Sequence, residues 1–378
     1  MEICWIGRDN MLTPKKLAKL ENNKVVELYE KLNKNLTNTI IKKLNSAGDI
    51  SSYTKAQLTV LKRNGGKQIF YEALNKTNKL SKQRKKEVKD LFQELEKQQV
   101  EGYDELYEYS DVNYDLESVS KQITDAIISR TNKELTNMTR SVAFRTQKEY
   151  INAVDDLYSK VITGGWSYDT AIKSTLIDLA NKGVTLKSNG REYTLEASVK
   201  RNLFTSIQQT ANEISARIKD DIKADAVWIA TTPYCRPSHR VINGVVMDLK
   251  EFEKKYEYLT EEPNCYHIVN YVIKDIFIPP QDKEEIKRIN DKADTVYENR
   301  QKQNYYARQV RQKKKEVANI GNSSKDILQD KRKQLRNAQM KYRTFSKSVG
   351  LEVDYLQTWQ AGYNGLKRGI WQKTDNDV

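Results

Sequence analysis

The sequence predicts a mostly helical α+β protein with a helical N-terminal region, a small antiparallel β domain and a basic C-terminal helical hairpin. Three observations support this fold class. Five of the six prolines lie between Pro233 and Pro280, so most of the remaining chain is free to be helical. Apolar residues outside that window recur every three or four positions, which is typical of amphipathic helices. Inside the window, β-branched and aromatic runs indicate short strands.

The composition narrows the functional classes. The chain has 378 residues and 38% apolar residues, enough for two or three domains with cores. Its net charge of +14 favours a polyanionic partner, either nucleic acid or an acidic protein surface. The sequence has neither an apolar run of about 18 residues nor a secretory signal, and three cysteines do not make a disulfide framework. We therefore expect a protein made in a reducing cytoplasm, with no membrane partner.

The helical N-terminal region is expected over residues 13–187, after an extension at 1–12. Thr13 fits a helix N-cap, and Pro14 fits the first helical position, where its missing N–H is not needed. A leucine-rich stripe then repeats at helical spacing and stops near Gly48. Its members are Val25, Leu28, Leu32, Leu36, Ile40, Ile41 and Leu44.

A second helical stretch is expected to be interrupted twice. Gly65 and Gly66 are poor helix formers, and the acidic, tyrosine-rich residues 101–115 are predicted to be an exposed connection. Residues 118–160 and 167–182 are predicted to be helical again.

The segment 188–280 is expected to hold one long helix and the small β domain. "SNGREY" predicts a turn, and Thr194 caps the helix that follows. "AVWIATT", "GVVMDL" and "YHIVNYVIKDIFI" predict three strands of one antiparallel sheet that ends at Pro279 and Pro280. The helix has a mixed three-and-four stripe: Val199, Leu203, Ile207, Ala211, Ile214, Ile218 and Ile222.

Two long helices are predicted over residues 281–350, with a tail at 351–378. They face each other across "GNSS", and apolar residues at multiples of seven indicate packing like that of a coiled coil. The two series are Ile289, Val296, Val310 and Val317, then Leu328, Leu335, Tyr342 and Val349.

This hairpin carries most of the excess positive charge. Between Lys302 and Arg343 there are thirteen Lys and Arg residues against three acids. Such runs are often only a solvated helix face, but this excess is concentrated and favours contact with a polyanion without sequence preference. The candidate nucleic-acid-binding residues are Arg308, Arg311, Lys313, Lys314, Lys315, Lys331, Arg332, Lys333 and Arg336.

Both histidines and two of the three cysteines of the chain lie at two corners of the predicted sheet. Cys235 and His239 stand at the first corner, and Cys265 and His267 at the second. Three interpretations remain open. The four residues could bind zinc, since thiolates and imidazoles are its preferred ligands. Cys265 could be a nucleophile with His239 as base and Asn264 as the orienting group. They could also form a packed, hydrogen-bonded core. No phosphate-binding loop, nucleophile elbow, HExxH or EF-hand pattern is present, so no catalytic residue is assigned.

Several of these motifs together resemble one known family. "CRPSHRVINGVV" and "PNCYHI" are similar to the core of the minor capsid, or minor head, proteins of tailed phages, within the broader head-morphogenesis group. Residues 130–144, the "GRE" at 190–192 and the basic "ARQVRQKKKE" segment resemble further parts of that family in the same order. The resemblance extends from about residue 11 to about residue 363.

The resemblance implies a virion component inside the capsid near the portal, assembled in the host cytoplasm. It implies a role in head assembly and in genome packaging or ejection, without enzymatic activity or a small-molecule substrate. The implied partners are the portal protein, the major capsid or scaffolding protein, and packaged double-stranded DNA. The core residues it implies are Arg236, Ser238, His239, Gly244, Asn264, Cys265 and His267.

Alternatives to this function remain open. Cys235 stands where the family commonly has a small residue, so a zinc site of the other three candidates alone would need a fourth ligand. The rival functions are a metal-dependent nuclease or toxin-like enzyme built on the Cys/His cluster, and a non-specific nucleic-acid-binding protein.

Overall fold

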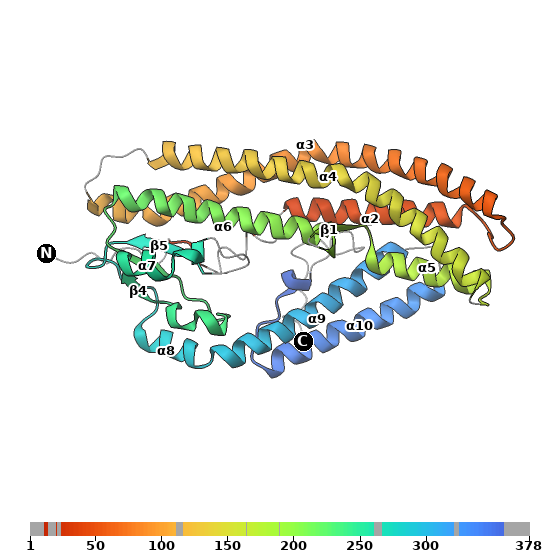
Figure 1. Ribbon diagram of the computed structural model, residues 1–378. Helices are drawn as coiled ribbons and strands as arrows, with labels where there is room; N and C mark the ends of the chain where they lie inside the picture. The colour runs from red at the N-terminus through yellow and green to blue at the C-terminus, as the bar shows by residue number, and fades with distance from the viewer. Residues whose placement is uncertain are drawn as a thin grey trace. The chain divides into compact units, whose positions relative to one another are not determined.

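Long helices dominate the computed structural model of the chain (Figure 1), which describes residues 11–13, 20, 24–110, 116–163, 165–188, 190–260, 267–320 and 325–358. The α-helices are α2 (Lys24–Asn45), α3 (Lys55–Ser110), α4 (Leu116–Ile162), α5 (Tyr168–Lys182), α6 (Leu195–Asp221), α7 (Leu249–Lys255), α8 (Lys283–Asp291), α9 (Ala293–Ile320) and α10 (Lys325–Ser348). The short 3-10 helices are η1 (Pro237–Ile242), η2 (Glu257–Thr260) and η3 (Tyr355–Thr358). Together with the small sheets below, this confirms the predicted, mostly helical α+β class.

The strands form two small antiparallel sheets in the described part of the chain. The larger sheet has the order β4-β3-β5 and confirms the three strands predicted from the β-branched runs. The smaller sheet is a hairpin of β1 and β2 at the segment predicted as a turn, so the turn is flanked by pairing that the sequence did not reveal. The strands are β1 (Thr185–Ser188), β2 (Arg191–Thr194), β3 (Ala226–Ile229), β4 (Val246–Asp248) and β5 (Val269–Val272).

The chain divides into two compact units, each drawn from three separate segments. Unit 1 is Met1–Asn23, Lys85–Glu134 and Lys200–Gln301, and unit 2 is Lys24–Arg84, Leu135–Val199 and Lys302–Val378. Helices α3, α4, α6 and α9 contribute residues to both units. The predicted segments follow chain order, whereas the compact units combine stretches that are distant in sequence.

Unit 1 is built around the three-stranded sheet. Trp228 of β3 is 1% exposed and packs against Phe277, with 5.3 Å between the ring centroids. Tyr103 of α3 donates a hydrogen bond to Ser215 Oγ (3.3 Å) in α6 and accepts one from the backbone N–H of Tyr271 (3.1 Å) in β5. The sheet, α3 and α6 therefore share one core.

The buried Tyr103 corrects one prediction. Residues 101–110 continue α3 instead of forming an exposed connection, because Tyr103 and Leu106 are both buried. The rest of that predicted connection, residues 111–115, lies outside the described residues, as do Pro14 and the start of the helix predicted there.

Glycine also failed to interrupt α3 where the sequence predicted it. The helix runs through Gly65 and Gly66 because α4 packs directly on its backbone there. A Cβ atom at Gly65 would collide with the ring of Tyr150, and one at Gly66 would lie 3.4 Å from the Gln147 side chain. These glycines therefore allow a close approach of two helices and do not end one.

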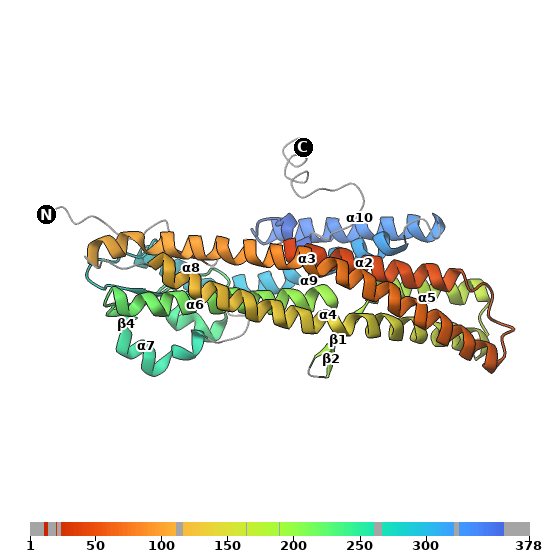
Figure 2. The ribbon, with the colours of Figure 1, turned by 90° about the horizontal axis from the view of Figure 1, so that it is seen from above.

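Unit 2 contains the predicted leucine stripe and the helical hairpin. The stripe residues of α2 are buried, as predicted. Helices α9 and α10 lie side by side in Figures 1 and 2. Their shared core confirms the seven-residue spacing at Val310, Val317, Leu335 and Tyr342, with Leu328 partly buried against it; Val349 is not part of this core. The members of the core are Ala307, Val310, Val317, Leu335 and Tyr342.

The beginning of the predicted hairpin differs. The first helix is broken at Lys292, so that Ile289 belongs to the short helix α8 and Val296 to α9. Both side chains are only partly buried, and residues 283–301 belong to unit 1. Among the described residues, no helix is both long and apolar enough to span a membrane.

Candidate functional site

The structure brings three of the four Cys/His residues together in unit 1. Pro237 starts η1, and the backbone N–H of His239 donates to the carbonyl of Arg236 (2.9 Å), which turns the imidazole inward. His267 lies two residues before β5. Cys235 Sγ is 3.4 Å from His267 Nε2, and the two imidazole rings have centroids 5.3 Å apart. Cys235, His239 and His267 are called the Cys/His cluster below.

All three residues of the cluster are buried, and burial sets the protonation state of His267. Cys235, His239 and His267 are 1%, 4% and 2% exposed. Burial, together with the nearby His239 and Arg236, lowers the pKa of His267 to about 4. The His267 imidazole is therefore neutral at pH 7, the form that binds metals and that both donates and accepts hydrogen bonds.

The zinc interpretation can be compared with this geometry. Two ligands of a tetrahedral zinc ion, one sulfur and one nitrogen, lie about 3.5 Å apart, close to the Cys235–His267 separation. The same distance also fits a sulfur hydrogen bond. The described residues contain no group of three or more His, Cys, Asp or Glu side chains arranged to hold a metal, and Cys265 lies outside them. The described geometry thus fits a hydrogen-bonded core, and zinc stays a prediction.

Elemental analysis separates the two interpretations. About one zinc ion per chain, with loss of unit 1 structure on chelation, would establish a structural metal site. A metal-free protein that is indifferent to chelators would leave the hydrogen-bonded core. The nucleophile interpretation needs Cys265 and Asn264, and both lie outside the described residues.

The turn beside the cluster depends on a residue that the sequence analysis missed. Asn243 is fully buried; its Oδ1 accepts from the Thr232 backbone N–H (2.8 Å), and its Nδ2 donates to Asn290 Oδ1 (2.8 Å). Gly244 follows at φ +80°, where a Cβ would lie 2.7 Å from Thr231 Oγ1. The signal was present as an Asn-Gly pair between two strands, which is typical of a tight turn. The role of Gly244 is therefore conformational.

The hairpin residues divide into two groups, and the first group serves the fold. Five of the nine predicted nucleic-acid-binding residues contact other parts of unit 2. Lys315 Nζ lies 3.3 Å from Glu196 Oε1, and Lys313 and Lys331 both pair with the buried Glu316, at 2.8 and 3.0 Å. Lys314 Nζ donates to the Thr358 carbonyl (2.8 Å), and Arg311 donates to that of Gln357.

These contacts correct an expectation about α9. Lys314 and Lys315 were predicted to contact nucleic acid, but the two residues are only 3% and 7% exposed. Burial, with the positive charges of Arg311 and Arg343, lowers the pKa of Lys314 to about 8, against the opposite effect of Glu30. The long side chain of a lysine beside an apolar stripe can reach an acceptor inside the protein. Counting the charged residues of a sequence does not reveal such an acceptor.

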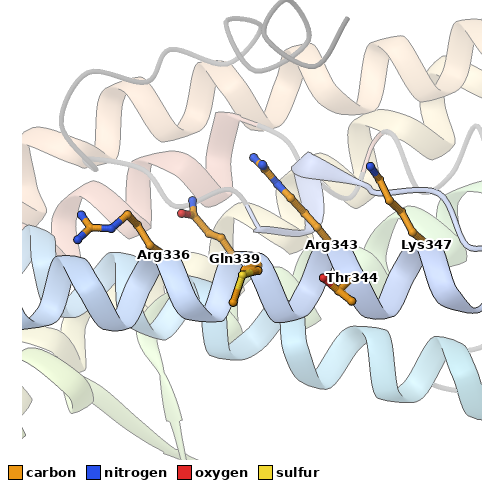
Figure 3. Close-up of a pocket in the computed structure, with 6 residues that line it drawn as sticks. Arg336, Gln339, Arg343, Thr344 and Lys347 are labelled. Atoms are coloured by element: carbon orange, nitrogen blue, oxygen red, sulfur yellow. The ribbon is translucent and has the colours of Figure 1, made fainter. Parts of the chain in front are cut away.

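The second group lies on the surface. Arg308, Arg332, Lys333 and Arg336 are exposed. On α10, basic residues at intervals of four, seven and four follow one side of the helix, and Figure 3 shows Arg336, Arg343 and Lys347 projecting from it around a surface hollow. We call this set the α10 basic row: Arg332, Arg336, Arg343 and Lys347.

Two members of the row were not among the predicted binding residues. Arg343 lies at the end of the interval over which charge was counted, and Lys347 lies beyond it. Their helical spacing from Arg336 was the signal that identifies them. Gln339 and Thr344 also line the hollow and add hydrogen-bonding groups.

Comparison with known proteins agrees with the resemblance seen in the sequence. A family model described as "Phage minor capsid protein 2" matches residues 12–347. Neither the curated proteins nor the solved structures gave a match.

Proposed function

Because this chain belongs to the phage minor capsid protein 2 family, and is thus a virion component, we propose that it works inside the head at the portal vertex. There it contacts the portal protein and the packaged double-stranded DNA during head assembly and genome packaging or ejection. It acts by binding and not by catalysis, in keeping with a structural capsid family.

The α10 basic row is the observation that carries the DNA contact. Residues 331–348 contain seven Lys and Arg residues and no acid. The row spans sixteen residues from Arg332 to Lys347, which is about 22 Å of helix. A duplex carries one phosphate charge per roughly 1.7 Å of its axis, so the exposed Arg332, Arg336 and Lys347 have phosphates within reach.

The row fits the DNA backbone better than the bases. Its side chains are spread along a helix whose other side is fixed against α9, and Tyr342 donates from that side to the Asp354 carbonyl (2.9 Å). Phosphate contacts position a protein without reading sequence. We therefore expect binding without sequence preference, as a protein that holds any part of a genome requires.

Two experiments test the proposed function. Purified chain titrated with random-sequence duplex DNA should bind at low salt, with log K falling against log salt at a slope near −0.9 for each phosphate contact. Absence of binding at low salt would overturn the DNA contact and leave an acidic protein surface as the partner of the row.

The second experiment tests location. Intact virions treated with protease should retain the chain, while outer tail proteins are digested, and the chain should co-purify with portal assemblies. Digestion at the rate of the tail proteins would contradict a position inside the head.

A further inference from the structure

Two neighbouring helices of unit 2 expose a cluster of aromatic side chains. Phe70 of α3 and Phe144 of α4 have ring centroids 4.8 Å apart, and Tyr71 packs edge-on against Phe70 at 5.5 Å. Phe144 is 64% exposed and Tyr71 is 51% exposed. Contiguous apolar groups on the surface of a folded protein mark interaction sites. Phe70, Tyr71 and Phe144 are called the aromatic patch below.

The position of the patch is fixed by the packing beneath it. Helix α3 meets α4 at Gly65 and Gly66, where the missing side chains let Tyr150 and Gln147 approach the α3 backbone. Phe144 does not fill this core, because its neighbours Val142 and Ala143 are the buried residues of that turn. The exposed ring is therefore held on a rigid two-helix support and is not needed for packing inside.

Basic residues predominate around the patch, and the exposed Glu72 beside Tyr71 lies 3.8 Å from Lys76. Arg140 and Lys148 lie one helical turn on either side of Phe144. Residues 60–71 and 137–148 together hold six basic residues and no acidic one: Lys62, Arg63, Lys67, Arg140, Arg145 and Lys148. Lys62 pairs with Asp155 at 2.8 Å, and the other five form no ion pair with an acid in the described part of the chain.

We propose that the aromatic patch and its basic rim dock an acidic protein surface with an apolar centre on another component of the virion. An apolar anchor surrounded by charge is the usual composition of a protein interface, and opposite charges on the partner would orient the encounter. The proposal rests on the family membership that makes the chain a virion component, not on the proposed DNA contact.

Other occupants fit less well. A second copy of the chain would bring two basic rims together, which opposes association. Duplex DNA offers no apolar pocket for Phe144. A single strand would need open, parallel ring faces for stacking, whereas Phe70 and Phe144 are tilted by 56° against each other.

The test measures binding to two defined probes, the purified portal protein and the purified major capsid protein of the same phage. The patch is altered by Phe144→Gln and Tyr71→Gln, and the rim by Arg140→Glu with Lys148→Glu. Ile162→Gln is the matched control, because Ile162 is 53% exposed on the same helix and in the same unit. Circular dichroism verifies the fold of each variant.

We expect one of the two probes to bind the unaltered chain. Phe144→Gln should raise the dissociation constant about tenfold or more, as for a central aromatic anchor. Charge reversal in the rim should weaken binding and reduce its dependence on salt, and Ile162→Gln should change nothing.

Three results would overturn the proposal: neither probe binds, Phe144→Gln leaves binding unchanged, or single-stranded oligothymidine binds with an affinity that depends on Phe144. Duplex DNA binding is measured on the same variants. Duplex DNA binding is assigned to α10. Its loss or absence would therefore count against the DNA contact of the proposed function and not against the aromatic patch.

Discussion

Helices α9 and α10 are both strongly basic, yet they use their positive charge in different ways. In α9, Lys314 and Lys315 are buried and bind a carbonyl and a carboxylate of unit 2. In α10, Arg332 and Arg336 are exposed and belong to a row along one side of the helix. The difference teaches that charge density in a sequence does not separate residues that hold a fold together from residues that face a partner.

The anchor of α9 shows how far this integration goes. Lys315 Nζ also donates to the Lys182 carbonyl (3.3 Å), and Glu196 accepts from the Asn33 amide (2.6 Å). Burial raises the pKa of Glu196, but the Lys315 charge and the Asn33 amide lower it further, so its net shift is downward. Gly183 has φ +63°, and a Cβ atom added there would lie 2.8 Å from Lys315 Nζ and 2.9 Å from Asn33 Oδ1, so no side chain fits. Four elements therefore meet at one ion pair.

The largest expected effect comes from breaking this anchor. Lys315→Met should lower the free energy of unfolding by about 3 kcal/mol or more, because Glu196 loses its partner in a largely buried place. Lys333→Met on α10 is the matched control, with an expected change within about 0.5 kcal/mol. Urea unfolding followed by circular dichroism measures both. An equal loss of unfolding free energy in the two variants would contradict the view that Lys315 of α9 holds the fold together while Lys333 of α10 does not.

The lowered pKa of Lys314 predicts that the stability of the chain depends on pH, which is a second difference between α9 and α10. Its pKa is about 8 in the folded chain and near its ordinary value of 10.5 in the unfolded chain. Between these values only the unfolded chain holds the proton, so stability should rise with pH, by about 3 kcal/mol over the full window.

The variant Lys314→Met isolates this contribution. The difference in unfolding free energy between the natural chain and the variant should grow as pH rises from 8 to 10.5. A difference that stays constant would mean that Lys314 is solvated like the exposed Lys333 of α10.

His267 gives the corresponding prediction for a buried basic group in unit 1. Its pKa of about 4 lies below the ordinary 6.5, so below pH 6.5 the unfolded chain binds a proton that the folded chain does not. Stability should therefore fall as pH drops from 6.5 to 4, by at most about 3 kcal/mol. The variant His267→Gln should lack this dependence in acid unfolding curves. A variant that keeps the full dependence would assign it to other groups.

The sequence predicted an element correctly where the pattern that defines it lies within one continuous stretch. It failed where a residue's role depends on contacts that are distant in sequence. The α2 and α6 stripes and the three strands of the larger sheet were predicted because their apolar period is written in consecutive residues. Gly65 was misread, because its reason for being glycine is Tyr150, which lies 85 positions away in sequence. The same limit applied to Tyr103, whose partners are in α6 and β5.

The candidate sites follow the same rule. Rarity and position singled out His239 and His267, and the fold places their rings 5.3 Å apart. The charge of α9 was visible, but its internal acceptors at Glu196 and Thr358 were not, since they lie far from Lys315 or beyond the hairpin. Helical spacing alone would have extended the row to Arg343 and Lys347.

Stability should hardly respond when charge is removed from the α10 basic row. The α10 variant carries three substitutions of exposed residues: Arg332→Gln, Arg336→Gln and Lys347→Gln. We expect its unfolding free energy to change by less than about 0.5 kcal/mol per site. A large loss of stability would show that the α10 basic row, like Lys314 and Lys315 of α9, serves the fold.

The salt dependence of duplex DNA binding by this α10 variant tests the central claim most directly. A control with the same net charge removes three exposed lysines from other helices of unit 2: Lys31→Gln, Lys42→Gln and Lys79→Gln. If the row contacts phosphates, the α10 variant should flatten the slope of log K against log salt by about 2.7, while the control keeps a slope close to that of the natural chain. An unchanged slope in the α10 variant, or equal flattening in both, would contradict the assignment of DNA binding to α10.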